Sequence, residues 1–258
     1  MKIKKFLSSI FWCPISSKEK IEYYQEKIRE LEWNAIKKFI PPSSTFLDVG
    51  CGAGYSLIKA KEELLCEVQG IDPEPGAHGV GRFTLGLWKD RPIIQGSAES
   101  LPFESDYFDV VYSSHVLEHV HSEDQALIEM KRVLKPGGVL IIGMPTATMS
   151  LVALVSAWLF TTHISFYHFI TSLDKKDNFK QFIRIFLPSS HSSPRKKYIT
   201  YDLLHYRISN WHKIVRKQFR IATILTPGLY PYPDYIQWFP LVQRAKFSSS
   251  VFFICTKD

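Results

Sequence analysis

Three glycines and a carboxylate stand within one short stretch, FLDVGCGAGYSL, at residues 46–57. Asp48 lies at the end of an apolar run, and Gly50, Gly52 and Gly54 follow it at alternate positions. A glycine-rich turn between a strand and a helix lets backbone amides come close to a ligand. Dinucleotide sites use the spacing G-x-G-x-x-G instead, and a carboxylate at the turn would repel a pyrophosphate. The residues therefore favour a ligand that carries an ammonium group, unless Asp48 only caps the turn.

A second carboxylate, Asp72, ends the next apolar run, 24 residues after Asp48. A carboxylate at a strand tip can accept hydrogen bonds from both hydroxyls of a ribose. The alternative is that Asp72 begins a turn with Pro73. The stretch GSAES, residues 96–100, follows a third apolar run and is placed to face an adenine edge. Asp72 and the stretch at residues 96–100 are therefore placed to face the ribose and the adenine of a nucleoside.

The elements that must position these residues alternate along the chain between short apolar runs and helical patterns. Strands are expected at residues 45–49, 66–72, 91–96, 108–114, 137–145, 220–225 and 245–257, and helices at 16–40, 55–65, 122–135 and 200–219. Alternating βα units imply a parallel sheet with helices on both faces. The sequence therefore predicts the α/β class.

Six motifs follow one another in the order DVGCGAG, GID, SAESLPF, FDVV, LEHV and LKPGG, within about residues 45–145. This order resembles that of the class I S-adenosylmethionine-dependent methyltransferases. It is most similar to their small-molecule group related to ubiquinone and menaquinone biosynthesis. The resemblance implies a seven-stranded Rossmann-like sheet, mostly parallel, with an antiparallel last strand. It also implies S-adenosyl-L-methionine as the cofactor of a methyl-transfer enzyme.

The resemblance also implies a role for individual positions. Asp48 and the backbone of residues 50–54 would hold the methionine moiety, Asp72 would bind the ribose, and Ser97 stands where the family often has Asp. The cofactor-binding residues expected in this way are Asp48, Gly50, Cys51, Gly52, Gly54, Asp72, Pro73, Ser97, Ala98, Glu99 and Ser114.

His115 is the candidate catalytic residue because it follows the fourth expected strand, where the resemblance places the sulfonium and the acceptor. A histidine with a pKa near neutral suits a general base for a hydroxyl acceptor. The alternative is that His115 begins a helix with its ring against the sheet. Glu118 and His119 are interpreted as a structural helix turn. An amine or carbanion acceptor would need no dedicated base.

The uncharged, aromatic-rich segment at residues 149–173 follows the fifth expected strand. Its length could span a bilayer, but a lid or an acceptor-pocket helix is the preferred interpretation. With the basic amphipathic start of the chain, it suggests a lipid-like or lipid-linked acceptor met at a membrane surface. The alternatives are a polar sugar or glycan precursor, a non-catalytic scaffold that binds the cofactor, and a nicotinamide-dependent dehydrogenase. Nucleic-acid bases are disfavoured because the strand at 108–114 leads into SSHV rather than an Asp/Asn-Pro-Pro-aromatic motif.

Composition sets the outer limits of the interpretation. The net charge of +7 fits an anionic partner or a solvated basic surface. The four cysteines show no C-x-x-C pair, which predicts free thiols in a reducing compartment. We expect a cytoplasmic protein with peripheral contact to the inner face of a membrane. Residues 1–40 would form a basic arm and helix, and residues 41–258 the methyltransferase domain, with an apolar insertion at about 146–200.

Overall fold

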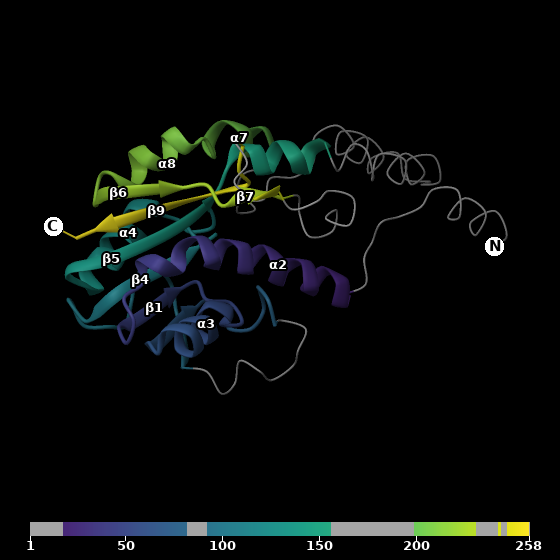
Figure 1. The fold of residues 1–258 in the computed structure, drawn as a ribbon. Coiled ribbons are helices and arrows are strands. Elements are labelled where there is room, and N and C mark those ends of the chain that lie inside the picture. Colours follow the sequence, from purple (N-terminus) through teal and green to yellow (C-terminus); the bar gives the residue numbers. More distant parts are fainter. Residues whose placement is uncertain (1–17, 82–91, 156–198, 231–241, 244–246, 258) are drawn as a thin grey trace, which may run out of the picture.

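The computed structural model describes residues 18–81, 92–155, 199–230, 242–243 and 247–257. One seven-stranded sheet runs through the molecule in the order β3-β2-β1-β4-β5-β9-β6 (Figure 1). The strands are β1 (Thr45–Val49), β2 (Glu67–Asp72), β3 (Ile93–Gln95), β4 (Phe108–Ser114), β5 (Leu134–Pro145), β6 (Arg220–Leu225) and β9 (Ser250–Thr256). The predicted Rossmann-like architecture is confirmed.

The strands β1, β2, β3, β4 and β5 are parallel neighbours, so their carboxyl ends meet at one edge of the sheet. Asp48 lies beside Gly70 of β2 and Tyr112 of β4 in the register. In an open α/β sheet, ligands bind outside the carboxyl ends of the strands, where the order reverses. Here the order reverses between β1 and β4, which places the glycine loop at that point.

The strand β9 is antiparallel and lies between β5 and β6. Its residues 250–255 are buried, as a strand inside a two-sided sheet requires. This confirms the predicted antiparallel last strand. A separate short antiparallel pair is formed by β7 (Gly228–Leu229) and β8 (Val242–Gln243), and neither strand was expected from the sequence.

Helices cover both faces of the sheet (Figure 1). The side chains of each strand point alternately to the two faces, so the molecule has two cores. Leu47 and Val111 share one core with helices α4 (Glu123–Val133) and α8 (Ile208–Val215). Phe46 and Val110 share the other core with α2 (Lys18–Ile36) and α3 (Tyr55–Leu64). The short helix η1 (Lys37–Phe39) continues α2 toward β1.

The helix expected at 200–219 is two helices, α7 (Ile199–His205) and α8. The break falls at Arg207, whose backbone is extended. The carbonyl of Tyr206 accepts a hydrogen bond from Ala147 N at 2.9 Å, and the Tyr206 ring stacks on Trp211. The hydrogen bond joins the turn to the segment after β5, and the ring contact joins it to α8. A helical pattern in the sequence does not reveal such contacts.

The apolar segment 149–173 is described only as far as residue 155, and residues 147–155 are helical. Among the described residues, no helix is long and apolar enough to cross a membrane. The amphipathic start of the chain and residues 156–198 of the expected insertion lie outside the described part. Cys66 and Cys255 are buried free thiols, as predicted.

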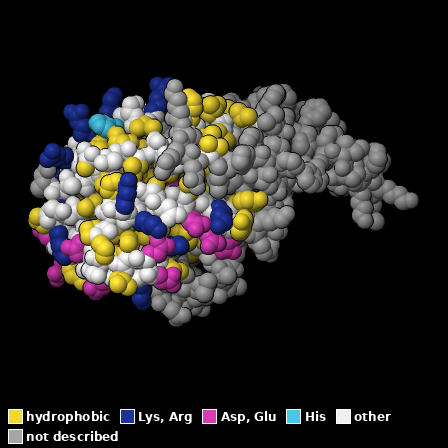
Figure 2. Space-filling view, viewed as in Figure 1, with side chains coloured by type: hydrophobic (Ala, Val, Ile, Leu, Met, Phe, Trp, Pro, Cys, Tyr) yellow, Lys and Arg dark blue, Asp and Glu magenta, His cyan; other side chains and the backbone are white. Residues whose placement is uncertain are grey.

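Figure 2 shows one face of the molecule. Lys and Arg side chains gather along its upper edge near α8, and acidic side chains lie in its lower half among further basic ones. Opposite charges on exposed surface are solvated and screened. The net charge therefore does not identify a partner.

Candidate active site

A cavity of about 720 Å³ lies at the carboxyl ends of β1, β2 and β4, against helix α2. A volume of this size is within the usual range for small-molecule sites, roughly 300–1,000 Å³. Its walls contain eight of the sequence-predicted site residues, namely Asp48, Gly50, Cys51, Gly52, Asp72, Pro73, Ser114 and His115. The structure thus brings the residues from three separate motifs to one space.

The glycine loop requires glycine for reasons of backbone geometry. Gly50 and Gly52 have φ of +79° and +55°, a left-handed region in which other residues are strained. A Cβ on Gly52 would lie 2.6 Å from the backbone oxygen of His78. Gly54, also left-handed, precedes the first turn of α3 and does not line the cavity. The loop therefore packs tightly against the segment after β2 while its backbone faces the cavity.

Asp48 is a buried carboxylate, 2% exposed, that accepts a hydrogen bond from the Ser56 hydroxyl. Burial raises the pKa of Asp48 to about 7, Ser56 and Arg29 oppose this shift, and the nearby charge of Asp72 adds to it. A positively charged ligand group would favour the ionised carboxylate. The site therefore suits an ammonium or sulfonium.

Asp72 is positioned by the backbone of two loops. One oxygen accepts from Gly52 N at 2.7 Å and the other from Glu74 N at 2.8 Å. Each carboxylate oxygen has a second acceptor site, so the fixed carboxylate can still accept from two hydroxyls. The residues present therefore fit the ribose and the cationic end of S-adenosylmethionine.

The three residues expected at the adenine do not line this cavity. Ala98 is buried in the core beside Leu101, and Ser97 pairs with Ser100 in an isolated bridge. Glu99 accepts a hydrogen bond from Ser122 N at 2.7 Å, at the start of α4. Their adenine role stays a prediction.

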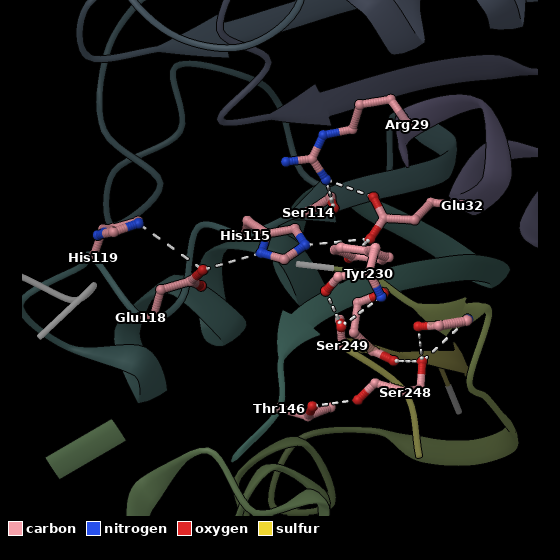
Figure 3. Close-up of polar contacts among 12 residues, drawn as sticks. Arg29, Glu32, Ser114, His115, Glu118, His119, Thr146, Tyr230, Ser248 and Ser249 are labelled. Atoms are coloured by element: carbon pink, nitrogen blue, oxygen red, sulfur yellow. Dashed lines mark hydrogen bonds and ion pairs between the residues drawn. The ribbon is translucent and has the colours of Figure 1, made fainter. Parts of the chain in front are cut away.

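His115 lies at the end of β4 between two buried carboxylates (Figure 3). Its Nε2 is 3.4 Å from Glu32 Oε1, and its Nδ1 is 3.5 Å from Glu118 Oε1. The backbone at His115 is left-handed, with φ +58°, and its N–H donates to Gly143 O at 2.9 Å. His115 therefore does not begin a helix with its ring against the sheet, as one interpretation of the sequence held.

The residues that surround His115 come from distant parts of the chain. Arg29 Nη1 donates to Glu32 at 2.6 Å and to Ser114 Oγ at 3.3 Å. The Tyr230 hydroxyl donates to Glu32 at 2.5 Å, and Ser249 holds the Tyr230 backbone. Sequence analysis missed Arg29, Glu32 and Tyr230.

The charges of this group stabilise one another. Burial opposes ionisation of Glu32, but Arg29 and His115 outweigh it and hold the pKa of Glu32 well below its usual range. Burial and Arg29 act to lower the pKa of His115, but Glu118 and Glu32 outweigh them and raise it. The two buried carboxylates therefore favour the protonated form of His115, which together with Arg29 offsets their charge. Within the described residues, no group of three or more side chains is arranged to hold a metal ion.

The middle of the chain is similar to known methyltransferases. Residues 47–142 match the family described as a methyltransferase domain. The ubiquinone/menaquinone biosynthesis C-methyltransferase UbiE of Vibrio parahaemolyticus is 39% identical over 108 residues, which are 39% of this chain and 41% of that protein. The tRNA U34 carboxymethyltransferase of Shewanella frigidimarina is 32% identical over 127 residues, 43% of this chain and 35% of that protein. The chain therefore spans less than half the length of these curated relatives.

Solved structures extend the likeness over most of the chain. A SAM-dependent methyltransferase of Thermotoga maritima, described as a possible histamine N-methyltransferase, has a TM-score of 0.55 and 18% identity. The match covers 93% of this chain and 94% of that one. At this identity the likeness shows the fold. The chain thus resembles the class I S-adenosylmethionine-dependent methyltransferases and, among them, UbiE, and the family implies S-adenosylmethionine as cofactor.

Proposed function

We propose that this protein transfers a methyl group from S-adenosylmethionine to a small-molecule acceptor. One observation carries the proposal: two buried aspartates and a left-handed glycine loop line the same cavity at the switch point of the sheet. In the proposed complex, Asp48 pairs with the ammonium, Asp72 accepts from the ribose hydroxyls, and the loop at residues 50–52 lies against the amino-acid portion. The cofactor supplies an activated methyl group on a sulfonium.

The chain's own residues position the reactants and exclude water. Ser114 and His115 line the cavity beyond the strand tips, where an acceptor would approach. Aligning an acceptor with the methyl–sulfur bond in a closed site lowers the barrier by orientation. Because His115 is engaged by two carboxylates, the proposed reaction does not rely on it as a base.

For the acceptor we propose a lipid-like or lipid-linked small molecule met at a membrane surface. Support comes from the sequence, in the apolar aromatic segment at 149–173 and the basic amphipathic start of the chain. The name of UbiE, which refers to quinone biosynthesis, agrees with an apolar small molecule. A polar sugar or glycan precursor is the competing acceptor.

Calorimetry with S-adenosylhomocysteine and with NAD tests the cofactor. We expect S-adenosylhomocysteine to bind and NAD not to bind. Asp72→Asn should weaken binding at least tenfold, while Asp124→Asn, on exposed surface of α4, should not. Tight NAD binding without S-adenosylhomocysteine binding would refute the proposal.

Turnover and the acceptor need separate measurements. Release of S-adenosylhomocysteine in the presence of quinone precursors or polyprenyl-linked substrates would support an enzyme with an apolar acceptor. Binding without release for any acceptor tried would favour a non-catalytic scaffold. Flotation with anionic liposomes tests the membrane contact, and a protein that stays in the soluble fraction would argue against it.

A further inference from the structure

A second cavity, of about 270 Å³, shares no lining residue with the cavity at the strand tips, which is called the first cavity below. Residues of α7 and α8 form most of its wall, together with Glu123 in the first turn of α4 and Glu118 in the segment between β4 and α4. A space of about 150 Å³ is enough for a molecule the size of benzene. The second cavity therefore has room for a short organic ligand or for the end of a longer one.

Glu118 is a buried carboxylate in the wall between the two cavities. It lines the second cavity, and its side chain is 0% exposed. Its Oε1 is 3.5 Å from His115 Nδ1 and 3.9 Å from His119 Nε2, and both histidines line the first cavity (Figure 3). Burial acts to raise the pKa of Glu118, but the two histidines outweigh it and hold the pKa below its ordinary value. Glu118 is therefore an anion at neutral pH.

The hydrogen-bonding capacity of this carboxylate is left unused. Among the described residues, neither oxygen of Glu118 has a hydrogen-bond partner. A carboxylate has about four acceptor positions, and buried polar groups in folded proteins are normally paired. Glu118 can therefore accept hydrogen bonds from a donor that enters the second cavity.

Aromatic side chains form the wall around this carboxylate, and their contacts hold them in place. Trp211 donates its indole N–H to Pro145 O at 2.9 Å, and its ring stacks on Tyr206. Tyr201 stacks on His205, whose Nδ1 is 2.9 Å from Tyr201 O. Aromatic faces attract cations and also pack against aliphatic chains. The wall therefore suits an organic cation with an apolar stem.

The charges that line the second cavity also favour a cation. Glu123, which is partly buried, adds a second carboxylate to that of Glu118. Lys213 is the one lysine or arginine among the described lining residues, and it is exposed. Its charge opposes a cationic ligand, but solvent screens an exposed charge more than a buried one.

We propose that the second cavity binds the ammonium group of a small amine, which donates hydrogen bonds to Glu118 while its apolar stem lies against Tyr201 and Trp211. The bound amine shares this carboxylate with His115 and His119, so its charge is felt in the wall of the first cavity. The site stands apart from the proposed methyl transfer, because none of its lining residues belongs to the first cavity.

Calorimetry with n-butylammonium and with n-butanol, at equal ionic strength, tests the site in the full chain. The two probes have the same apolar stem, and only the first carries a charge. We expect butylammonium to bind about tenfold more tightly or better, because a hydrogen bond between charged groups contributes more than one to a neutral group. Glu118→Gln should remove this preference.

Two substitutions at the rim should move the affinity for butylammonium in opposite directions. Glu123→Gln removes an attractive charge and should weaken binding about threefold, while Lys213→Gln removes the opposing charge and should strengthen it by a similar factor. Asp124→Asn is the matched control, because Asp124 follows Glu123 in the chain, is half exposed and does not line the cavity. It should leave the affinity unchanged. These variants also test the site if Glu118→Gln does not fold.

Imidazole NMR signals give a second readout. Butylammonium should shift the signals of His115 and His119 in the wild type, and butanol should not. His121, which is 73% exposed and lines neither cavity, should be unaffected by either probe.

The carboxylate of Asp48 could bind the same probe in the first cavity, so the titrations are repeated with Asp48→Asn. We expect the affinity for butylammonium to be unchanged in that variant. Loss of binding in Asp48→Asn would assign the probe to the first cavity and overturn the proposal. Equal affinity of the wild type for the two probes, or a preference for butylammonium that persists in Glu118→Gln, would overturn it as well.

Discussion

Replacing Asp48 with asparagine should change stability and ligand affinity in opposite directions. In the folded protein the pKa of Asp48 is about 7, against an ordinary value of 3.8. The folded state therefore holds the proton more tightly than the unfolded state. Between about pH 4 and pH 7 the Asp48 carboxyl is ionised in the unfolded state but still protonated in the folded state. Its contribution therefore lowers the free energy of unfolding as the pH rises through this range. Above about pH 7 the carboxyl is ionised in both states, and the free energy of unfolding falls no further on account of this group.

The size of the effect follows from the pKa difference of roughly 3 units, at 1.36 kcal/mol per unit, which gives about 4 kcal/mol as an upper limit. Asparagine keeps an oxygen for the Ser56 hydroxyl and removes the buried charge. We expect Asp48→Asn and the wild type to have similar stability at pH 4. At pH 8 the variant should be more stable, by up to about 4 kcal/mol.

Affinity should respond in the opposite way, because the ammonium of S-adenosylhomocysteine needs the ionised carboxylate. Below about pH 7, wild-type affinity should fall about tenfold per pH unit as Asp48 takes up its proton. Asp48→Asn should bind weakly at every pH, and the slope assigned to Asp48 should be absent.

Urea unfolding at pH 4, 6 and 8 gives the stabilities, and calorimetry over the same range gives the affinities. Asp124→Asn is the control for a lost surface carboxylate, since Asp124 is half exposed on α4. The reasoning is refuted if the wild type gains stability relative to Asp48→Asn as the pH rises. Equal pH dependence of binding in the two proteins would refute it as well.

Three further substitutions test other parts of the structure. Gly52→Ala forces a side chain into a left-handed backbone and against His78 O at 2.6 Å, so urea unfolding should show a loss of roughly 1–3 kcal/mol and calorimetry a loss of S-adenosylhomocysteine binding. Tyr230→Phe removes a donor to the buried Glu32 carboxylate and should cost about 1.5–3 kcal/mol in urea unfolding; no loss would mean that water replaces the hydroxyl. Leu127→Ala empties part of a fully buried core position and should lower the free energy of unfolding by about 2–5 kcal/mol, with nucleoside affinity unchanged at temperatures where the variant is folded.

Short-range patterns predicted the elements that surround the glycine loop of the cavity. β1 and β4 have the bounds expected from their apolar runs, and α3 differs from its prediction by one residue. These elements are defined by local sequence: a buried strand, a glycine turn, then an amphipathic helix. The order of the motifs predicted that Asp48 and Asp72 lie at the same edge of the sheet. They do so because β1 and β2 are parallel neighbours.

The wall of the cavity formed by α2 and the end of β4 could not be predicted in the same way, because its residues meet only through tertiary contacts. Arg29 and Glu32 stand on the helix expected at residues 16–40, in which the sequence analysis identified no site residue. One signal was present in the sequence: Glu32 lies four residues after Ile28 and four before Ile36, on the buried face of α2. A charge on such a face requires partners. Tyr230, 198 residues away in the chain, has no local signal for that role.

The position of β9 has a consequence for how the protein is made. Ribosomes synthesise the chain from its N-terminus, so the strands β1 to β5 can pair with one another before the rest of the chain is made. The edge of β5 and the whole of β6 must wait until residues 250–256 have been synthesised, because β9 alone joins them. During that interval a nascent chain exposes an apolar strand edge, the kind of surface that recruits chaperones or other unfinished chains.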